Sequence, residues 1–251
     1  MLFKNEIKYI KGLSERAART DSGRYVVEGD KMVGELLDAG LEVENIYLTE
    51  RSRLFGMEGA VSVTEKEMER ISGLRTPSSA LAVVHIPNGI FVPKCAKGEL
   101  VLALDDLQDP GNLGTIIRIA DWYGIRHIFC SAHTVDCYNP KCVQATMGAL
   151  FRVEVHYGDL PSMLREAKEE GVAIYGTLLD GENIYEKKIT ESGIIIIGNE
   201  GKGISAEVER LVDTRLFLPS WPTDCRSSES LNAAVATAVV CAEFRRRQIM
   251  R

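Results

Sequence analysis

Cysteine, aromatic residues and long apolar runs are all scarce in this sequence. The 251 residues include six cysteines, none of them in a CxxC pair, and aromatic residues make up 7% of the chain. The longest nearly apolar run, residues 231–242, is interrupted by polar residues and is shorter than the roughly 18 residues that a membrane span requires. These absences argue against a disulfide scaffold and a membrane-spanning helix, and they favour reduced, mostly buried thiols.

The histidines also lack a spacing typical of metal ligands. The four histidines are His85, His127, His133 and His156, with no HxxxH pair and no cysteine pair beside them. Zinc sites usually show their ligands as close pairs in the sequence. We therefore expect no metal.

The charge distribution limits the ways in which the chain can bind a polyanion. The formal net charge of −6 argues against binding through bulk positive charge, but residues 1–24 and the last seven residues are locally basic. The first twenty residues alternate charged and apolar side chains without a uniform apolar stretch, which disfavours a secretory signal. We expect a cytoplasmic protein.

The pattern of apolar runs predicts two α/β units. Hydrophobic residues at 45% and charged residues at 26% are ordinary globular values. Two alternating series of expected strands and helices, at residues 1–86 and 99–251, are separated by a linker at 87–98 that is rich in proline, glycine and lysine. Runs such as LVLAL and IIII lack polar alternation, which is typical of parallel strands covered on both faces. The fold class is therefore α/β, with a small N-terminal domain and a C-terminal parallel sheet.

Three stretches that follow expected strands are candidates for a ligand site, because ligands of open α/β sheets gather at the carboxyl ends of strands. In the first stretch, an Asp-Pro-Gly turn precedes Asn112, which could cap the helix that follows. Gly114 and Arg118 are four residues apart and share one face of that helix. The alternative is a surface helix in which Arg118 pairs with Asp121 or stacks on Trp122.

The second stretch, IIIIGNEGKGIS, is a strand that enters a glycine-rich turn. Glycines at 198, 201 and 203 permit unusual backbone angles, and the following helix offers free amide donors. A P-loop is ruled out, because Ile196 and Gly203 occupy positions that require glycine and a hydroxyl residue. GxGxxG also fails, since the order here is GxxGxG. The alternative is a turn without a ligand.

In the third stretch, we expect the last helix to begin near Ser228 and to hold Asn232 in its first turn. An amide among small apolar residues needs a partner, because an unsatisfied one costs about 1–3 kcal/mol. Alternatively, Ser228 or Ser230 caps the helix and Asn232 faces solvent. The sequence has no Gly-x-Ser-x-Gly motif, which weakens hydrolase interpretations.

Taken in order, the NxGxxxR of residues 112–118, the GNEGKG of 198–203 and the SLN of 230–232 resemble the three motifs of the SpoU family. Residues 8–40 resemble the substrate-binding module of that family. The resemblance implies an RNA ribose 2′-O-methyltransferase of the SPOUT class that uses S-adenosylmethionine, with a trefoil knot in its C-terminal domain. Periodicity alone would have predicted an ordinary open sheet, since chains generally avoid knots.

The resemblance also implies roles for individual residues. The residues matching the catalytic motifs are Asn112, Arg118, Glu200, Ser230 and Asn232. The expected cofactor contacts, in three loops, are Thr177, Leu178, Gly198, Asn199, Gly203, Leu218 and Leu231. The loop at residues 220–228 looks longer than the common form of the family, and its Trp221 and Arg226 could contact RNA or cover the cofactor.

The expected partners are RNA and a second copy of the chain. The candidate RNA contacts in the basic N-terminal segment are Lys8, Lys11, Arg16, Arg19 and Arg24. The sequence does not separate transfer RNA from ribosomal RNA. A small-residue stripe on the last helix, Ala234, Ala238 and Cys241, could form a homodimer surface, or it could be buried within one subunit.

The chemistry can proceed without a metal, because methyl transfer to a ribose oxygen is an in-line displacement that depends on positioning and electrostatics. A guanidinium keeps its proton and has no acceptor, so Arg118 is better suited to stabilise the developing alkoxide or to clamp a phosphate than to act as a base. The alternative function is a catalytically inactive RNA-binding or assembly module with the same fold. The presence of Asn112, Arg118, Glu200 and Asn232 argues against it.

Overall fold

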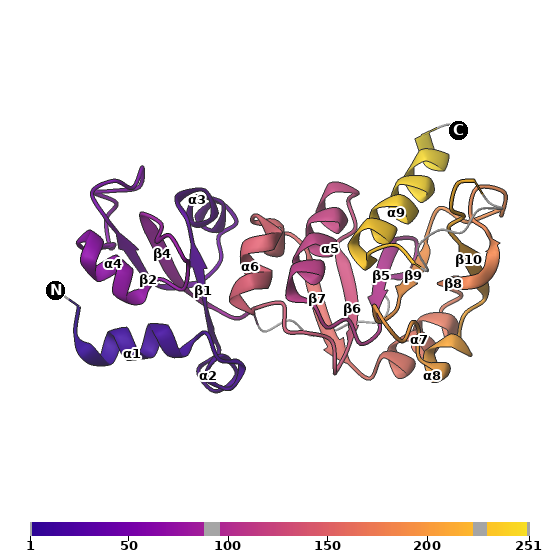
Figure 1. Ribbon diagram of the computed structural model, residues 1–251, viewed down its shortest axis with the longest axis horizontal. Helices are drawn as coiled ribbons and strands as arrows, with labels where there is room; N and C mark the ends of the chain where they lie inside the picture. Colours follow the sequence, from indigo (N-terminus) through magenta and orange to yellow (C-terminus); the bar gives the residue numbers. More distant parts are fainter. Residues whose placement is uncertain (1, 88–95, 223–229, 250–251) are drawn as a thin grey trace. The chain divides into compact units, whose positions relative to one another are not determined.

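The computed structural model describes residues 2–87, 96–222 and 230–249, which form two compact units (Figure 1). The first unit contains Met1–Asn88 and Asp136–Arg152, and the second contains Gly89–Val135 and Val153–Arg251. Most of the expected linker, at 88–95, lies outside the described residues. The division into functional domains at 1–86 and 99–251 remains a prediction.

The N-terminal unit is a four-stranded sheet with helices around it. The strand order is β1-β4-β2-β3, with β4 antiparallel to β1 and β2, and β3 parallel to β2. Its strands are β1 (Arg24–Glu28), β2 (Val43–Leu48), β3 (Val61–Ser62) and β4 (Ala80–His85). Its helices are α1 (Lys4–Gly12), α2 (Arg16–Ser22), α3 (Asp30–Asp38) and α4 (Glu65–Ile71).

A capping box starts α4. The hydroxyl of Thr64 accepts from the backbone N–H of Glu67, while the Glu67 carboxylate accepts from the Thr64 N–H at 3.0 Å. The backbone N–H groups of Thr64 and Leu2 donate to this carboxylate and lower the pKa of Glu67 to about 2. The spacing of Thr64 and Glu67 in the sequence therefore marks the beginning of this helix correctly.

The N-terminal unit also contains a segment from later in the chain. Helix α6 (Pro140–Thr146) and the short helix η2 (Ala149–Phe151) belong to it. The amide of Gln144 donates to the carbonyl of Glu28 at the end of β1, at 2.9 Å. Our sequence analysis did not anticipate α6.

The C-terminal unit is a six-stranded sheet in the order β10-β8-β9-β5-β6-β7, and every strand pair in it is parallel. Its strands are β5 (Leu100–Leu104), β6 (His127–Ser131), β7 (Glu154–Gly158), β8 (Ile174–Asn183), β9 (Gly193–Ile197) and β10 (Thr214–Phe217). All residues of β5 and β9 are buried, as expected for strands covered on both faces.

Helices cover both faces of this sheet. Figure 1 shows α5 (Pro110–Trp122) and α9 (Ala233–Ile249) on one face and α7 (Leu160–Glu169) and α8 (Ala206–Glu209) on the other. The α/β class with a parallel C-terminal sheet is therefore confirmed. The trefoil knot remains a prediction, since strand order and register do not define how the chain threads.

Helix α9 differs from its prediction in two respects. It begins at Ala233, so Asn232 precedes the helix and does not lie in its first turn; Ser228 is outside the described residues. Ala234 and Cys241 are 4% and 0% exposed, so two of the three residues of the small-residue stripe are buried within the chain's own fold. Within the described ranges, α9 and the other helices lack the combination of length and apolar character needed to cross a bilayer.

Candidate active site

The carboxyl ends of β5 and β9 bring the first two motif segments together. The strands are parallel, and Leu104 of β5 lies opposite Ile197 of β9 at their last paired residues. The next residue, Asp105, donates its backbone N–H to the Ile197 carbonyl at 3.0 Å. The segments that leave the two strands therefore start side by side.

Glu200 is held by the segment that leads into α5. One carboxylate oxygen accepts from the side-chain amide of Asn112 at 3.0 Å and from the backbone N–H of Asp109 at 3.4 Å. The other oxygen accepts from the backbone N–H of Gln108 at 3.3 Å. Three donors on one segment fix the position of this carboxylate, although Glu200 is itself exposed.

Asn232 joins the same network from the third motif. Its side-chain N–H donates to the side-chain oxygen of Asn112 at 2.9 Å. Its own oxygen accepts from the backbone N–H groups of Ala234 and Val235, at 3.0 and 3.3 Å, and so caps α9. Asn112, Glu200 and Asn232 thus form one hydrogen-bonded group, which we name the amide–carboxylate cluster.

The cap of α5 is not the residue that we expected. Asp109 accepts from the backbone N–H of Asn112 at 2.8 Å, with Pro110 at the first helical position. The side chain of Asn112 is thereby free to bond Glu200 and Asn232. This corrects the prediction that Asn112 caps the helix, and it leaves the Asn112 amide in the cluster.

The turn after β9 is closed by its own hydrogen bonds. The backbone groups of Asn199 and Gly203 bond each other at 2.9 and 3.0 Å. The Asn199 side-chain oxygen accepts from the backbone N–H groups of Gly201 and Lys202, both at 2.9 Å. A Cβ on Gly198 would lie 2.3 Å from the Gly203 carbonyl carbon, so a close backbone approach requires this glycine. The backbone amides of Gly201 and Lys202 are therefore already bonded within the turn.

Two acidic residues that sequence reasoning missed support this site. Asp105, which is 5% exposed, accepts from the backbone N–H of Ser205 at 2.8 Å and so fixes the entry to α8. Asp106 has a φ of 58°, and its carbonyl accepts from the Asn199 side chain at 2.7 Å. Both residues directly follow the buried strand β5, and this position in the sequence could have identified them as site residues.

The expected loop after the start of β8 is a bulge in a strand. Two consecutive residues of β10 pair with Gly176 and with Glu182, so residues 177–181 are left out of the ladder. The bulge includes Thr177 and Leu178, which are both half-buried. The Thr177 hydroxyl donates to a carbonyl of β9 at 2.9 Å. Since β8, β9 and β10 are neighbouring parallel strands, the bulge lies at the same end of the sheet as the turn after β9.

The third expected cofactor segment is only partly described. Leu218 is half-buried after β10, and Leu231 is 52% exposed before α9. Trp221 is 90% exposed, whereas Arg226 lies outside the described residues. Ser230 is exposed.

Arg118 stands apart from the amide–carboxylate cluster. It is exposed on α5, and it has no hydrogen bond or ion pair within the part of the chain that the structure describes. Neither the pairing with Asp121 nor the stacking on Trp122 that we considered is formed there, and Trp122 is 84% exposed. The guanidinium is thus open to solvent.

Comparisons with known proteins identify the family of this chain. The model of the SpoU rRNA Methylase family matches residues 99–242, and that of the MRM3-like substrate binding domain matches residues 4–82. The chain belongs to the SpoU rRNA methylase family. It is 34% identical to the 23S rRNA (guanosine(2553)-2′-O)-methyltransferase RlmP of Bacillus subtilis, over 96% of each chain.

Solved structures of SpoU and TrmH proteins share the fold. One is a protein of the TrmH family of RNA methyltransferases from Porphyromonas gingivalis, with 38% identity, a TM-score of 0.87 and coverage of 98% of this chain and 99% of that one. Another is the AdoMet-bound rRNA methyltransferase from Sinorhizobium meliloti, with 26% identity, a TM-score of 0.86 and coverage of 98% and 96%. The SpoU resemblance inferred from the three motifs is confirmed.

The N-terminal unit of this SpoU protein presents only part of its basic segment to solvent. Lys8, Lys11 and Arg16 are exposed, although Lys11 also donates to a backbone carbonyl at 2.7 Å. Arg24 is half-buried and pairs with a glutamate at 2.6 Å. Arg19 is 2% exposed and pairs with Asp136 at 2.6 Å. The expected place of Arg19 on an RNA-facing surface is therefore corrected, because its guanidinium is bound inside the unit.

Proposed function

We propose that this chain transfers a methyl group from S-adenosylmethionine to the 2′-hydroxyl of a ribose in ribosomal RNA. The observation that carries the proposal is the amide–carboxylate cluster, in which one residue from each of the three SpoU motifs is joined by hydrogen bonds. The 2′-hydroxyl is the group that distinguishes RNA from DNA. Nothing favours the alternative of an inactive module.

The residues at the carboxyl ends of β8, β9 and β10 fit the cofactor. S-adenosylmethionine supplies a methyl group on a sulfonium when it is bound. The apolar side chains of Leu178, Leu218 and Leu231 are partly or largely exposed and suit the adenine ring. The remaining proposed contacts are polar or backbone groups of Thr177, Gly198, Asn199 and Gly203. The AdoMet-bound relative from Sinorhizobium meliloti supports S-adenosylmethionine as the cofactor.

We assign the catalytic step to Arg118 together with the cluster. The solvent-exposed guanidinium of Arg118 can stabilise the alkoxide that develops on the ribose, or it can clamp the neighbouring phosphate. Glu200, Asn112 and Asn232 hold α5, α9 and the turn after β9 at fixed distances, which is the positioning that an in-line displacement requires. Ser230 lies two residues before Asn232 and is proposed to contact the substrate.

We prefer ribosomal RNA to transfer RNA as the substrate. RlmP of Bacillus subtilis and RlmB of Neisseria meningitidis, at 34% and 30% identity, are both named for methylation of 23S rRNA, and the matches cover 96% and 90% of this chain. The exposed Lys8 and Arg16 are the proposed RNA contacts of the N-terminal unit, with Lys11 and Arg24 contributing charge nearby. A ribosomal substrate also supports the expected cytoplasmic location.

Ribose methylation mapped across total RNA, from cells with and without this protein, tests the proposal. We expect one 2′-O-methylated position in ribosomal RNA to disappear when the protein is absent. Loss of a methyl group from transfer RNA alone would overturn the substrate assignment. An unchanged map would overturn the activity.

We also propose a homodimer, through a surface that differs from the expected stripe. Val235 of α9 is 50% exposed, and Trp122 of the adjoining α5 is 84% exposed. These two large apolar side chains are available for contact with a second copy of the chain. Sedimentation at micromolar concentration should give a dimeric mass, and Trp122→Asp should shift it toward the monomer. A monomeric wild-type protein would contradict the proposal.

A further inference from the structure

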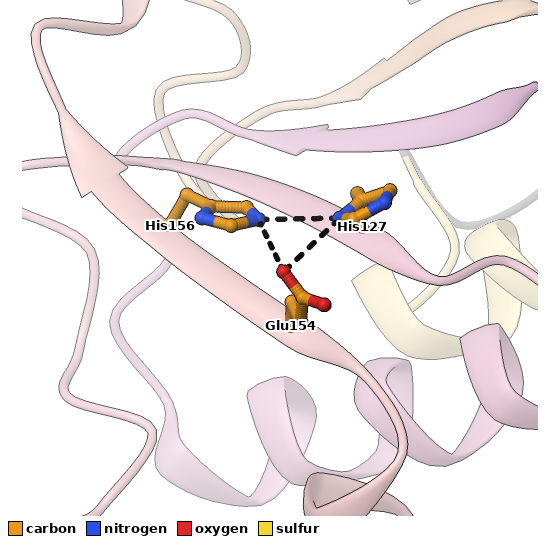
Figure 2. A group of neighbouring side chains, drawn as sticks. All are labelled: His127, Glu154 and His156. Carbon is orange, nitrogen blue, oxygen red and sulfur yellow. Dashed lines mark hydrogen bonds and ion pairs between the residues drawn. The ribbon is translucent and has the colours of Figure 1, made fainter. Parts of the chain in front are cut away.

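Three potential metal ligands converge at the end of the C-terminal sheet opposite the candidate active site. His127 is the first residue of β6 and Glu154 the first residue of β7, and the two are paired in the parallel ladder. His156 follows two residues after Glu154, so it lies on the same face of β7. Figure 2 shows the two imidazole rings and the carboxylate directed toward one another.

The three side chains contact one another through one hydrogen bond and two longer ion pairs. The His127 Nδ1 and His156 Nε2 atoms are 3.2 Å apart, which a single shared proton can explain. The Glu154 carboxylate oxygen, however, lies 3.6 Å from each of these nitrogens, which is too far for a hydrogen bond to either. The three atoms therefore form a nearly equilateral triangle around one point.

The dimensions of the triangle match those of a tetrahedral metal site. Ligand atoms about 2.0–2.1 Å from a zinc ion are separated from one another by about 3.3–3.4 Å in tetrahedral geometry. The observed separations of 3.2, 3.6 and 3.6 Å bracket that value. Two histidines and one carboxylate form a common zinc ligand set that leaves a fourth position for water.

The three side chains differ in exposure, so that one side of the proposed metal site is open to solvent and the other is buried. The side chains of His156 and His127 are 7% and 16% exposed, whereas that of Glu154 is 67% exposed. The His156 ring packs edge-on against Phe129, with centroids 6.1 Å apart, which fixes its orientation.

We propose that His127, Glu154 and His156 bind zinc or another divalent first-row transition ion, with water completing the coordination. The ion links β6 to β7, which is the edge strand of the sheet. Because the site lies at the amino-terminal ends of these strands, it is at the opposite end of the sheet from the residues proposed for methyl transfer. Histidine spacing in the sequence did not indicate this site, because His127 is on β6 and the other two ligands are on β7, and the two strands meet only in the folded sheet.

Metal binding to the tag-free, full-length protein tests the proposal directly. Equilibrium dialysis against Zn²⁺ should give one ion per chain, and Co²⁺ in its place should show the visible absorption of a tetrahedral site. Zinc should also raise the melting temperature, because it binds the folded state alone.

The variants Glu154→Gln and His127→Gln separate this site from adventitious binding. Each should lose at least about tenfold in zinc affinity, since even a second-shell change typically costs that much. Glu154→Gln is the safer variant, because its side chain is exposed and the fold does not depend on it. His133→Gln, an exposed histidine outside the cluster, should bind like the wild type. The proposal fails if the wild type binds no zinc, or if Glu154→Gln binds zinc as tightly as the wild type does.

Discussion

In the C-terminal unit, one polar residue from each of the three motifs joins a single hydrogen-bonded cluster. In the N-terminal unit, by contrast, several residues of the basic segment bond to the unit's own carbonyls and carboxylates. Asn112, Glu200 and Asn232 meet although they are far apart in the chain. Arg19, by contrast, is buried against Asp136. Motif spacing identifies a site because parallel strands bring their carboxyl ends together, but a run of basic residues does not by itself identify a binding surface.

The largest effect should come from Arg118, a motif residue whose guanidinium is open to solvent and outside the cluster. Arg118→Ala should reduce turnover by about 10²–10³, as expected when one donor to a developing oxyanion is removed, while cofactor affinity changes little. Arg118→Lys keeps the charge without the planar fork and should recover part of the activity. Methyl incorporation into RNA and cofactor titration measure the two effects.

The control for Arg118 is Arg210→Ala, since Arg210 is another exposed arginine of the same unit with no side-chain partner among the described residues. It should remain fully active. If Arg118→Lys were as inactive as Arg118→Ala, charge stabilisation would not be its role. A fully active Arg118→Ala would remove Arg118 from the catalytic step altogether.

Arg19 and Arg16 allow a buried and an exposed arginine of the basic segment to be compared for their effects on stability and on RNA binding. Arg19→Met leaves the largely buried Asp136 without its partner and should lower the free energy of unfolding by about 3 kcal/mol. Arg16→Met should leave stability unchanged, weaken RNA binding and reduce the slope of affinity against salt by about one. Urea unfolding and RNA titrations at several salt concentrations separate the two. Equal stability of the two variants would show that the ion pair has no structural role.

A pair of glycines in one turn tests whether the backbone after β9 must keep its shape. The Cβ of Gly198→Ala would approach backbone atoms of the same turn to 2.3 Å, so the turn must shift. The variant should lose at least about tenfold in cofactor affinity and about 1–3 kcal/mol of stability. In Gly201→Ala the nearest atom is 3.7 Å away, so binding and stability should hardly change. Calorimetric titration with S-adenosylmethionine compares them, and equal affinities would refute the requirement.

The smallest effect concerns acid stability in the N-terminal unit. The pKa of Glu67 falls from an ordinary value of 4.5 to about 2 on folding, so its contribution is present above pH 4.5 and is lost as the pH falls toward 2. The free energy of unfolding of Glu67→Gln should therefore fall less steeply than that of the wild type as the pH is lowered over this range. Glu69→Gln, an exposed change on the same helix, should follow the wild type. Urea midpoints at pH 3 and pH 6 provide the measurement, and identical pH dependence in both variants would contradict the cap.

The sequence was informative where the determinants of structure are local. Apolar runs marked the buried strands β5 and β9, and the Thr64–Glu67 spacing marked the start of α4. Helix α6 was not predicted, although Asn139 caps it and Pro140 stands at its first position, a local start signal that the sequence contains. Its place in the N-terminal unit depends on a contact between Gln144 and Glu28, which are far apart in the chain.

The candidate site was predictable in its residues but not in its contacts. The motif spacing named the members of the amide–carboxylate cluster, yet the choice of Asp109 as the cap, which frees Asn112 for Glu200, depends on side-chain geometry. The bulge at residues 177–181 depends on how β8 pairs with β10. The sequence of β8 alone does not determine this pairing, so the bulge was not predicted.

Methyl transfer to ribosomal RNA purified from cells that lack this protein tests the central claim most directly. The purified chain, S-adenosylmethionine and this RNA should yield one 2′-O-methylated nucleotide, identified by mass spectrometry of nuclease digests. Arg210→Ala should give the same product, and Arg118→Ala should give almost none in the same time. A methyl group on a base, or no methylation by the wild type, would contradict the account.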